Sequence, residues 1–227
     1  MKMVSKRMKE AHDAYDKSKV LPLQEAIALA QKLSTEKCSP AVDIVMSLGL
    51  PKGESVRGAL SPEDGIGKSK RVAVLAQGDQ VAKATDAGAD IVGSDDLIEM
   101  IQKGDMNFDV LIATPDMMPK VGKVGRILGP KGLMPNLKLG TVTTDVAQAV
   151  KNAKSGQIFF RSDNAGSLHA RLGPVAFKPE QLINTVQTLV AELKRLKPAR
   201  AKGQYIRSCF VSTTMGPGIR VDIHTLD

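Results

Sequence analysis

Strand-like and helix-like patterns alternate over residues 71–113, which read RVAVLAQGDQVAKATDAGADIVGSDDLIEMIQKGDMNFDVLIA. The continuous apolar run 72–76 and the segment 109–113, which is apolar after Asp109, are typical of strands that are buried on both faces. Between them, 79–87 and 94–104 have helical spacing and end at glycines. Strands that alternate with helices in this way form largely parallel sheets, so the sequence predicts an α/β unit here.

The flanking segments have a different pattern. Upstream, residues 22–33 place apolar side chains at helical spacing, and residues 42–48 alternate like a half-buried strand. Downstream, the patterns predict strands at about 158–161, 168–172, 205–214 and 219–224, with a helix from Pro179 that ends before Pro198. The upstream part alone offers too few elements to enclose a core.

Both chain ends are therefore expected to fold together. The predicted fold class is α/β in two domains: an α+β domain built from residues 1–66 and 160–227, and an inserted three-layer, Rossmann-like α/β domain of residues 67–159. The chain would cross between them twice, near Gly67 and Gly156. Two neighbouring crossings predict a hinge.

The composition bounds the class of protein. Of 227 residues, 42% are hydrophobic and 25% charged, which is typical of a soluble globular protein. There is no Trp, with 2 Tyr and 5 Phe, so the core must be aliphatic and few rings are available for stacking on bases. We expect no membrane span and no export signal, and two isolated cysteines fit a reducing cytosol.

The positive charge is unevenly distributed. The net charge of +8 favours a polyanionic partner. The end-built segments hold 20 basic against 14 acidic residues, whereas 67–159 holds 12 against 10. No acid occurs between Glu192 and Asp222, and that stretch contains seven Lys and Arg residues. This is either a solvated face or, as we favour, an RNA surface.

No catalytic constellation is found in the sequence. Residues 65–69, GIGKS, are superficially similar to a P-loop, but Pro62 stands where that motif requires glycine. His12, His169 and His224 lack metal-ligand spacing. We therefore expect neither an enzyme nor a cofactor or metal site. The acid-free basic segment 120–138, with a glycine-rich loop at 125–132, is either a solvent-exposed turn or a second nucleic-acid contact.

Several motifs are shared with one family. They are Asp86–Asp90 (DAGAD), Ala113–Asp116 (ATPD), Gly125–Asn136 (GRILGPKGLMPN), Lys202-Gly203 followed by Arg207-Ser208, and Ser212–Pro217 (STTMGP). In this order they resemble the large-subunit ribosomal protein L-one family, and the likeness runs from about residue 20 to residue 227. A collinear set of this length is far more specific than any single motif.

The resemblance implies a non-catalytic structural constituent of the large ribosomal subunit. It implies binding to 23S-type rRNA at the mobile stalk beside the tRNA exit site, with help in releasing deacylated tRNA. It also implies translational repression through the protein's own mRNA. The expected partners are rRNA, exit-site tRNA and that mRNA, in a cytoplasmic protein that is monomeric off the ribosome and binds no membrane.

The resemblance also assigns site residues. By position, Thr214, Met215 and Gly216 match an RNA-contacting turn, Ser208 an RNA-facing serine, and Glu25 and Lys37 contacts from the first helix and its exit. The full set of expected RNA contacts is Glu25, Lys37, Arg161, His169, Ser208, Thr213, Thr214, Met215 and Gly216.

Physical reasoning about these residues is compatible with RNA binding. Strand parity places Ser208, Ser212 and Thr214 on one face, where hydroxyls can bond to 2′-OH and phosphate groups. The tetrapeptide 215–218 is a predicted turn whose glycines permit unusual backbone angles and close approach. Met215 packs either on RNA or in the core, and Arg161 either pairs with a phosphate or covers a sheet edge. Cys38 stands where the family usually has an aromatic residue.

Overall fold

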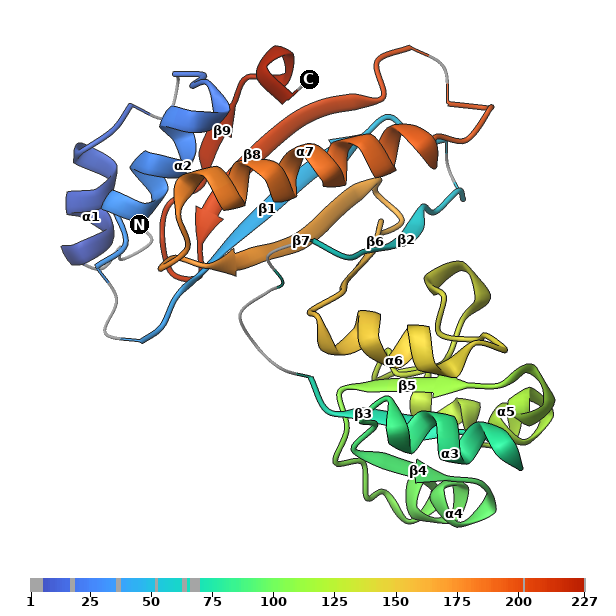
Figure 1. The fold of residues 1–227 in the computed structure, drawn as a ribbon. Coiled ribbons are helices and arrows are strands. Elements are labelled where there is room, and N and C mark those ends of the chain that lie inside the picture. Colours follow the sequence, from blue (N-terminus) through green and yellow to red (C-terminus); the bar gives the residue numbers. More distant parts are fainter. Residues whose placement is uncertain are drawn as a thin grey trace. The chain divides into compact units, whose positions relative to one another are not determined.

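The computed structural model describes residues 6–16, 19–35, 38–51, 53–62, 65, 70–201 and 203–226. By its contacts the chain divides into two compact units, one of Met1–Gly67 with Ile158–Asp227 and one of Lys68–Gln157. We call the first the end-built unit and the second the insert. Each unit contains both helices and strands (Figure 1).

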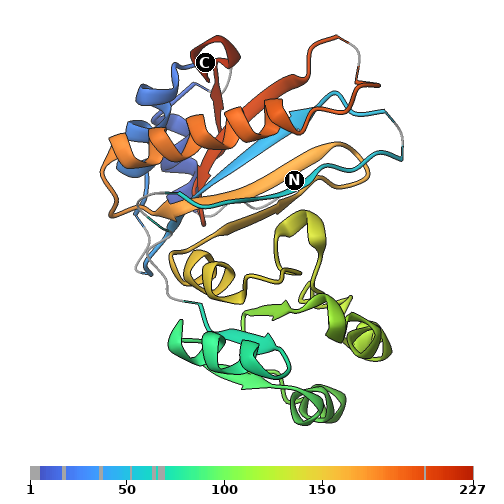
Figure 2. The same ribbon diagram turned by 45° about the vertical axis from the view of Figure 1, so that its right-hand side comes forward.

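The end-built unit is organised around a four-stranded antiparallel sheet. Its strand order is β7-β1-β8-β9, with β1 Ala41–Leu48, β7 Ser167–Pro174, β8 Ile206–Thr213 and β9 Ile219–Val221. Helices α2 (Leu23–Lys32) and α7 (Pro179–Arg195) pack against each other over one face of this sheet (Figures 1 and 2). The remaining elements are α1 (Lys6–Asp13), a two-stranded ribbon of β2 (Arg57–Leu60) and β6 (Ile158–Arg161), and the 3-10 helix η3 (Ile223–Leu226).

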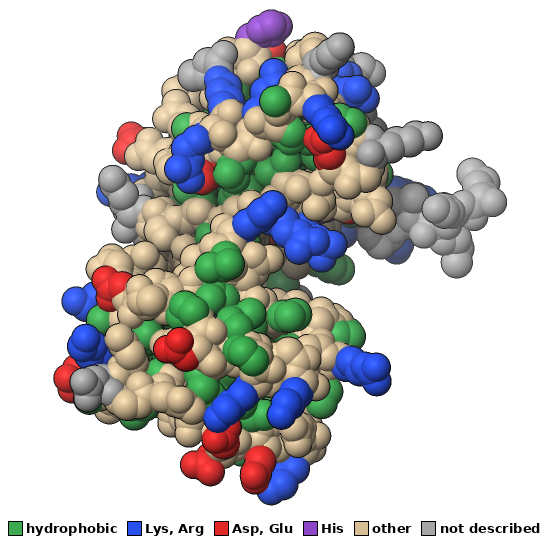
Figure 3. Space-filling model, turned by 90° about the vertical axis from the view of Figure 1, so that its right-hand side faces the viewer, with side chains coloured by type: hydrophobic (Ala, Val, Ile, Leu, Met, Phe, Trp, Pro, Cys, Tyr) green, Lys and Arg blue, Asp and Glu red, His purple; other side chains and the backbone are tan. Residues whose placement is uncertain are grey.

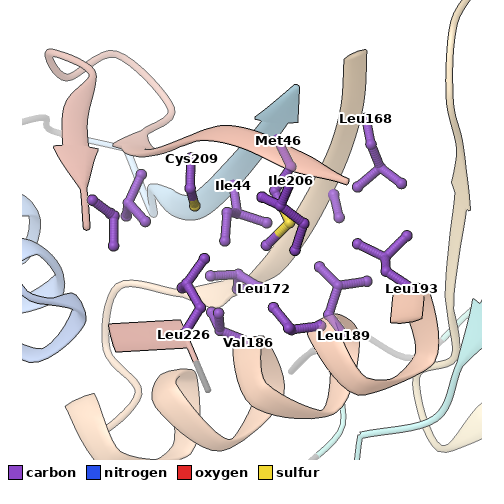
Figure 4. Packing of buried hydrophobic residues seen from close by; sticks show 14 of the residues in the cluster. Ile44, Met46, Leu168, Leu172, Val186, Leu189, Leu193, Ile206, Cys209 and Leu226 are labelled. Atoms are coloured by element: carbon purple, nitrogen blue, oxygen red, sulfur yellow. The ribbon is translucent and has the colours of Figure 1, made fainter. Parts of the chain in front are cut away.

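The core of this unit lies between the sheet and α7. Along most of each strand every second residue points inward, because side chains alternate between the faces of a strand. A register shift between β1 and β8 interrupts this alternation, so that both Ile206 and Cys209 are buried in the core. Figure 4 shows these side chains meeting the apolar stripe of α7. The packed residues are aliphatic, as the composition requires, and include Ile44, Met46, Leu168, Leu172, Val186, Leu189, Leu193, Ile206 and Cys209.

The insert contains a three-stranded parallel sheet, as the alternating pattern predicts. Its order is β4-β3-β5, with β3 Val72–Leu75, β4 Ile91–Gly93 and β5 Val110–Ala113. Around it lie α3 Asp79–Asp86, α4 Asp95–Lys103, α5 Met118–Leu128 and α6 Val146–Lys154, with short 3-10 helices η1 Pro115–Met117 and η2 Leu137–Leu139. Helices α4 and α5 share one core cluster with the sheet, whereas α3 packs on α6, which contacts β3 and β5.

Four local features differ from the sequence-based predictions. Helix α1 and strand β2 were not expected, since α1 buries no residue and β2 has only four residues with Gly58 among them. The last strand ends at Val221 rather than at 224, and η3 follows it. Residues 125–128, expected in a loop, form the end of α5. Within the described residues, no helix combines the length and apolar character needed to cross a bilayer.

Candidate nucleic-acid interface

The second face of the four-stranded sheet is not packed against any helix of the end-built unit that the structure describes. We call it the outer face. Its side chains are exposed or half-buried, in contrast to the fully buried residues that alternate with them. They are Ser167, His169 and Arg171 of β7, Asp43, Val45 and Ser47 of β1, Ser208, Phe210 and Ser212 of β8, and Arg220 of β9.

The strand register arranges these side chains in three rows. The first row is Ser167–Ser47–Ser208, the second is His169–Val45–Phe210–Arg220, and the third is Arg171–Asp43–Ser212. Directly paired residues of neighbouring strands lie about 5 Å apart at Cβ. Hydroxyls, two guanidinium groups, an imidazole and an exposed ring are therefore collected on one surface. That is the inventory expected for contacts with phosphate, sugar and bases.

The turn after β8 is joined to the start of β1 by a side chain. The hydroxyl of Thr214 accepts a hydrogen bond from the Ala41 amide at 2.9 Å, and the Thr214 amide donates to the Ala41 carbonyl at 3.0 Å. The Met215 side chain is 57% exposed, so it is not a core methionine. The Thr214 hydroxyl therefore holds the turn in place, and Met215 is the side chain that projects from it.

Thr213 does not reach the surface. It is 3% exposed, and its hydroxyl has no hydrogen-bond partner in the described structure. Strand alternation explains this, because Thr213 has the inward parity of Val211 and Cys209. Its side chain is therefore not part of the surface available to RNA, contrary to the expectation from the sequence.

Gly216 is needed for a different reason from the one predicted. Neither Gly216 nor Gly218 has a positive φ, so the turn uses no left-handed backbone conformation. A Cβ at Gly216 would instead overlap the Thr213 hydroxyl. The Gly216 amide also donates to the Thr213 carbonyl at 3.0 Å. The glycine thus lets the turn close tightly over the buried threonine.

Helix α1 and the residues that follow it hold the same turn from outside. Arg7 Nη2 donates to the Met215 carbonyl at 2.8 Å, and the Tyr15 hydroxyl donates to the Gly218 carbonyl at 2.7 Å. Tyr15 packs on the edge of the core, and this burial raises the pKa of its hydroxyl. Two carbonyls of the turn are thus bound by protein donors, and the exposed side chain of Met215 is available to a partner.

A pair of arginines faces each other on the β2–β6 ribbon. Arg57 and Arg161 are direct cross-strand partners, and like charges in that relation destabilise a ribbon. Nε of Arg57 is buried without a hydrogen-bond partner in the described structure. An anion between the two would remove both costs. Arg57 was missed in the sequence because no strand was predicted there, so nothing indicated its position opposite Arg161.

The other predicted contacts lie in several places. His169 and Ser208 share the outer face, in adjacent rows. Glu25 is exposed in the first turn of α2, whose inward residues join the core on the opposite side of the sheet. Cys38, at the usually aromatic position, is exposed. The predicted contact Lys37 lies outside the described residues.

The basic segment of the insert is divided between helix and loop. Lys120 in α5 forms an ion pair with Asp95 at 2.7 Å, so it is engaged within the insert. The loop that follows and the first residue of η2 expose apolar side chains, with Met134 at 43% and Leu137 at 75%. In Figure 3, hydrophobic side chains gather on the visible face of the insert, with Lys and Arg side chains around them.

The described residues group no side chains for metal binding, and the thiol of Cys209 is buried. No group of three or more His, Cys, Asp or Glu side chains in the described ranges is placed to hold a metal ion. Burial raises the pKa of the Cys209 thiol to about 12, so its reactive thiolate is scarce at neutral pH.

Comparison with known proteins gives a consistent result. The model of the Ribosomal protein L1p/L10e family matches residues 23–217. The chain is 49% identical to the large ribosomal subunit protein uL1 of Thioalkalivibrio sulfidiphilus over 98% of this chain and 97% of the relative. It is 48% identical to uL1 of Alcanivorax borkumensis over the same shares. It is 50% identical to uL1 of Acinetobacter baylyi over 100% of this chain and 99% of the relative.

The class of the protein follows from these similarities. It is a structural, non-enzymatic constituent of the large subunit of the cytoplasmic ribosome. More specifically, the chain belongs to the Ribosomal protein L1p/L10e family. The family resemblance noted in the sequence is thereby confirmed, as is the prediction that the protein is not an enzyme.

Proposed function

We propose that the outer face and the turn at 214–216 bind 23S-type rRNA at the mobile stalk of the large subunit, beside the tRNA exit site. The observation that carries this proposal is the grouping of His169, Arg171 and Arg220 with the serine hydroxyls on one uncovered sheet face. Phosphates would pair with the guanidinium groups, and 2′-hydroxyls with Ser47, Ser208 and Ser212. Met215 would pack against a sugar or base. Glu25, which is exposed on α2, and Lys37 remain proposed RNA contacts.

The ribbon supplies a second proposed contact. The juxtaposed Arg57 and Arg161 form a dication that favours a phosphate, and we assign it to exit-site tRNA. Through this contact the protein would assist the release of deacylated tRNA. Charge reversal in Arg161→Glu is expected to weaken tRNA binding while rRNA binding stays within about twofold.

Translational repression would use the rRNA surface again. A segment of the protein's own mRNA that imitates the rRNA site would compete for the outer face, because both ligands need the same groups. Competition between the two RNAs in one binding assay tests this point. Simultaneous binding of both RNAs to one protein molecule would exclude it.

The proposed movement of the molecule rests on its chain organisation. We propose that residues 1–66 with 160–227 and residues 67–159 act as two domains joined by a hinge at the two crossings. Such a hinge would let the insert move while the end-built domain holds the rRNA. The protein would be a monomer off the ribosome. Small-angle scattering of the free and RNA-bound protein tests the hinge, since one fixed separation under all conditions would exclude it.

The main experiment compares arginine variants in filter binding to a folded stalk rRNA fragment. Arg171→Gln and Arg220→Gln are each expected to weaken binding and to lower the slope of log affinity against log salt by about 1, because each removes one phosphate contact. Lys103→Gln in α4 of the insert is the matched control and should leave both quantities unchanged. Equal effects of all three variants would contradict the assignment of the outer face.

A further inference from the structure

One acidic side chain lies within the otherwise cationic and neutral outer face. Asp43 occupies the middle of the third row, between Arg171 and Ser212. A carboxylate there opposes phosphate binding, so the electrostatic account of the surface gives it no role. The β1–β7 register shifts between Val42 and Asp43, and such bulges redirect a side chain from the regular pattern.

Asp43 lies in a shallow depression of the outer face. The depression is lined by the side chains of Asp43, Val45, His169, Arg171 and Ser212, together with Ile44 and Ala170. An acceptor, a guanidinium plane, an imidazole ring and a hydroxyl therefore surround one small space with an apolar wall. A flat, polar-edged ligand fits this combination, since His rings and Arg guanidinium planes both stack on bases.

The carboxylate of Asp43 has no fixed partner among the described residues. No hydrogen bond or ion pair within 4.0 Å is formed between it and any of them, although Arg171 is near enough to attract it. Partial burial raises the pKa of Asp43 more than Arg171 lowers it. The side chain therefore loses hydration without gaining a donor, which is a cost that a ligand donor would remove.

The chemistry of the carboxylate selects among the bases. An ionised carboxylate only accepts hydrogen bonds, and its two oxygens can accept two parallel ones. Guanine presents two adjacent donors, N1–H and the N2 amino group, on its Watson–Crick edge. Adenine and cytosine each offer an amino group beside an acceptor nitrogen, and uracil offers one N–H between two carbonyls. A carboxylate therefore pairs best with guanine.

We propose that this depression binds an unstacked guanine of the RNA, with Asp43 accepting hydrogen bonds from its Watson–Crick edge and His169 and Arg171 flanking the base. This inference rests on the proposed function, and it adds a base-specific contact to a surface otherwise read through phosphates and hydroxyls. It assigns Asp43 a role in specificity rather than in affinity for RNA in general.

The test uses the full-length protein and inosine, which lacks the N2 amino group of guanosine. Stalk rRNA fragments carrying inosine at random guanosine positions are selected for binding, and the disfavoured positions are mapped. Wild type is expected to exclude inosine from at least one position, and Asp43→Asn should lose that exclusion. Asp43→Asn should also bind the unmodified fragment about tenfold more weakly, in line with the loss of one specific base contact.

The matched control is Asp116→Asn, which removes an exposed carboxylate from the insert. It should keep the inosine pattern of wild type. The inference is overturned if Asp43→Asn keeps the wild-type exclusion of inosine. It is also overturned if Asp43→Asn binds the unmodified fragment as tightly as wild type or more tightly, as simple removal of a negative charge would cause. It is also overturned if wild type excludes inosine nowhere. If any of these results occurs while wild type still binds the rRNA fragment with the normal salt dependence, only the guanine contact is disproved and the proposed rRNA function stands. If wild type does not bind the fragment at all, the guanine contact and the rRNA function are both disproved.

Discussion

The two faces of the four-stranded sheet are formed by the same strands but differ in role: one packs in the core and the other faces outward. In β1, Ile44 and Met46 are fully buried against the helices, whereas Asp43, Val45 and Ser47 face outward. The chain changes from core to surface at each residue because strand side chains alternate. Residues that stabilise the core thus alternate with residues that face a binding partner. Substitutions at neighbouring positions should therefore affect either stability or RNA binding.

The largest expected effect is on the inner face. Leu189→Ala in α7 removes a side chain that is 1% exposed and should cost roughly 2–5 kcal/mol of stability, through lost burial and the cavity left behind. Urea unfolding measures this. Thr188→Ala, one position along the same helix and exposed, is the control and should change stability by less than about 0.5 kcal/mol. Similar losses for both would mean that α7 does not pack as described.

The next largest loss of stability is expected in the turn after β8. Gly216→Ala places a methyl group against the Thr213 hydroxyl and should cost about 1–3 kcal/mol, as overpacking does. Thr213→Ala removes the obstacle, so the double variant should recover much of the loss relative to Thr213→Ala alone. Thermal unfolding of the four proteins gives the coupling. Additive losses would contradict a steric role for Gly216.

A smaller effect is expected where the segment after α1 holds the turn. Tyr15→Phe removes the hydrogen bond to the Gly218 carbonyl and should cost about 0.5–1.5 kcal/mol. Tyr205→Phe is the matched control, because the Tyr205 hydroxyl is buried without a partner in the described structure and its removal should cost nothing. The reverse order of the two losses would show that the Tyr15 contact does not stabilise the turn.

The smallest expected effect is the slow reaction of the buried Cys209 thiol with a thiol reagent. The raised pKa of Cys209, about 12, means that its thiol is almost entirely protonated at pH 8, whereas Cys38 is exposed. A thiol reagent should therefore modify one cysteine in the folded protein and two after denaturation. Mass spectrometry of the labelled peptides identifies the site. Fast labelling of Cys209 under native conditions would contradict the packing of the inner face.

Sequence patterns were informative where periodicity was long. The parallel strands of the insert and helix α7 could be predicted because apolar runs and helical stripes repeat over many residues. Strand β2 could not, because four residues around Gly58 carry no clear alternation, and Arg57 was missed with it. Thr213 was misplaced because a motif names residues without stating which way each side chain points.

The outer face shows a further limit of sequence reasoning. Its rows join residues from β1, β7 and β8 that are far apart in the chain, and no local pattern gives the register between them. The position of Asp43 between Arg171 and Ser212 follows only from that register, whereas the exposure of Phe210 follows from the same strand parity as that of Ser208 and Ser212. The expectation that rings would contribute little to the surface is thus modified by one exposed phenylalanine.

Labelling of histidines by diethyl pyrocarbonate tests most directly whether the outer face holds the rRNA. His169 is exposed on that face, and His224 is exposed on η3, which packs against β8 and α7. With a saturating stalk rRNA fragment, His169 should be protected while His224 reacts as it does in the free protein. Equal labelling of His169 with and without bound rRNA would contradict the assignment of the outer face as the RNA surface.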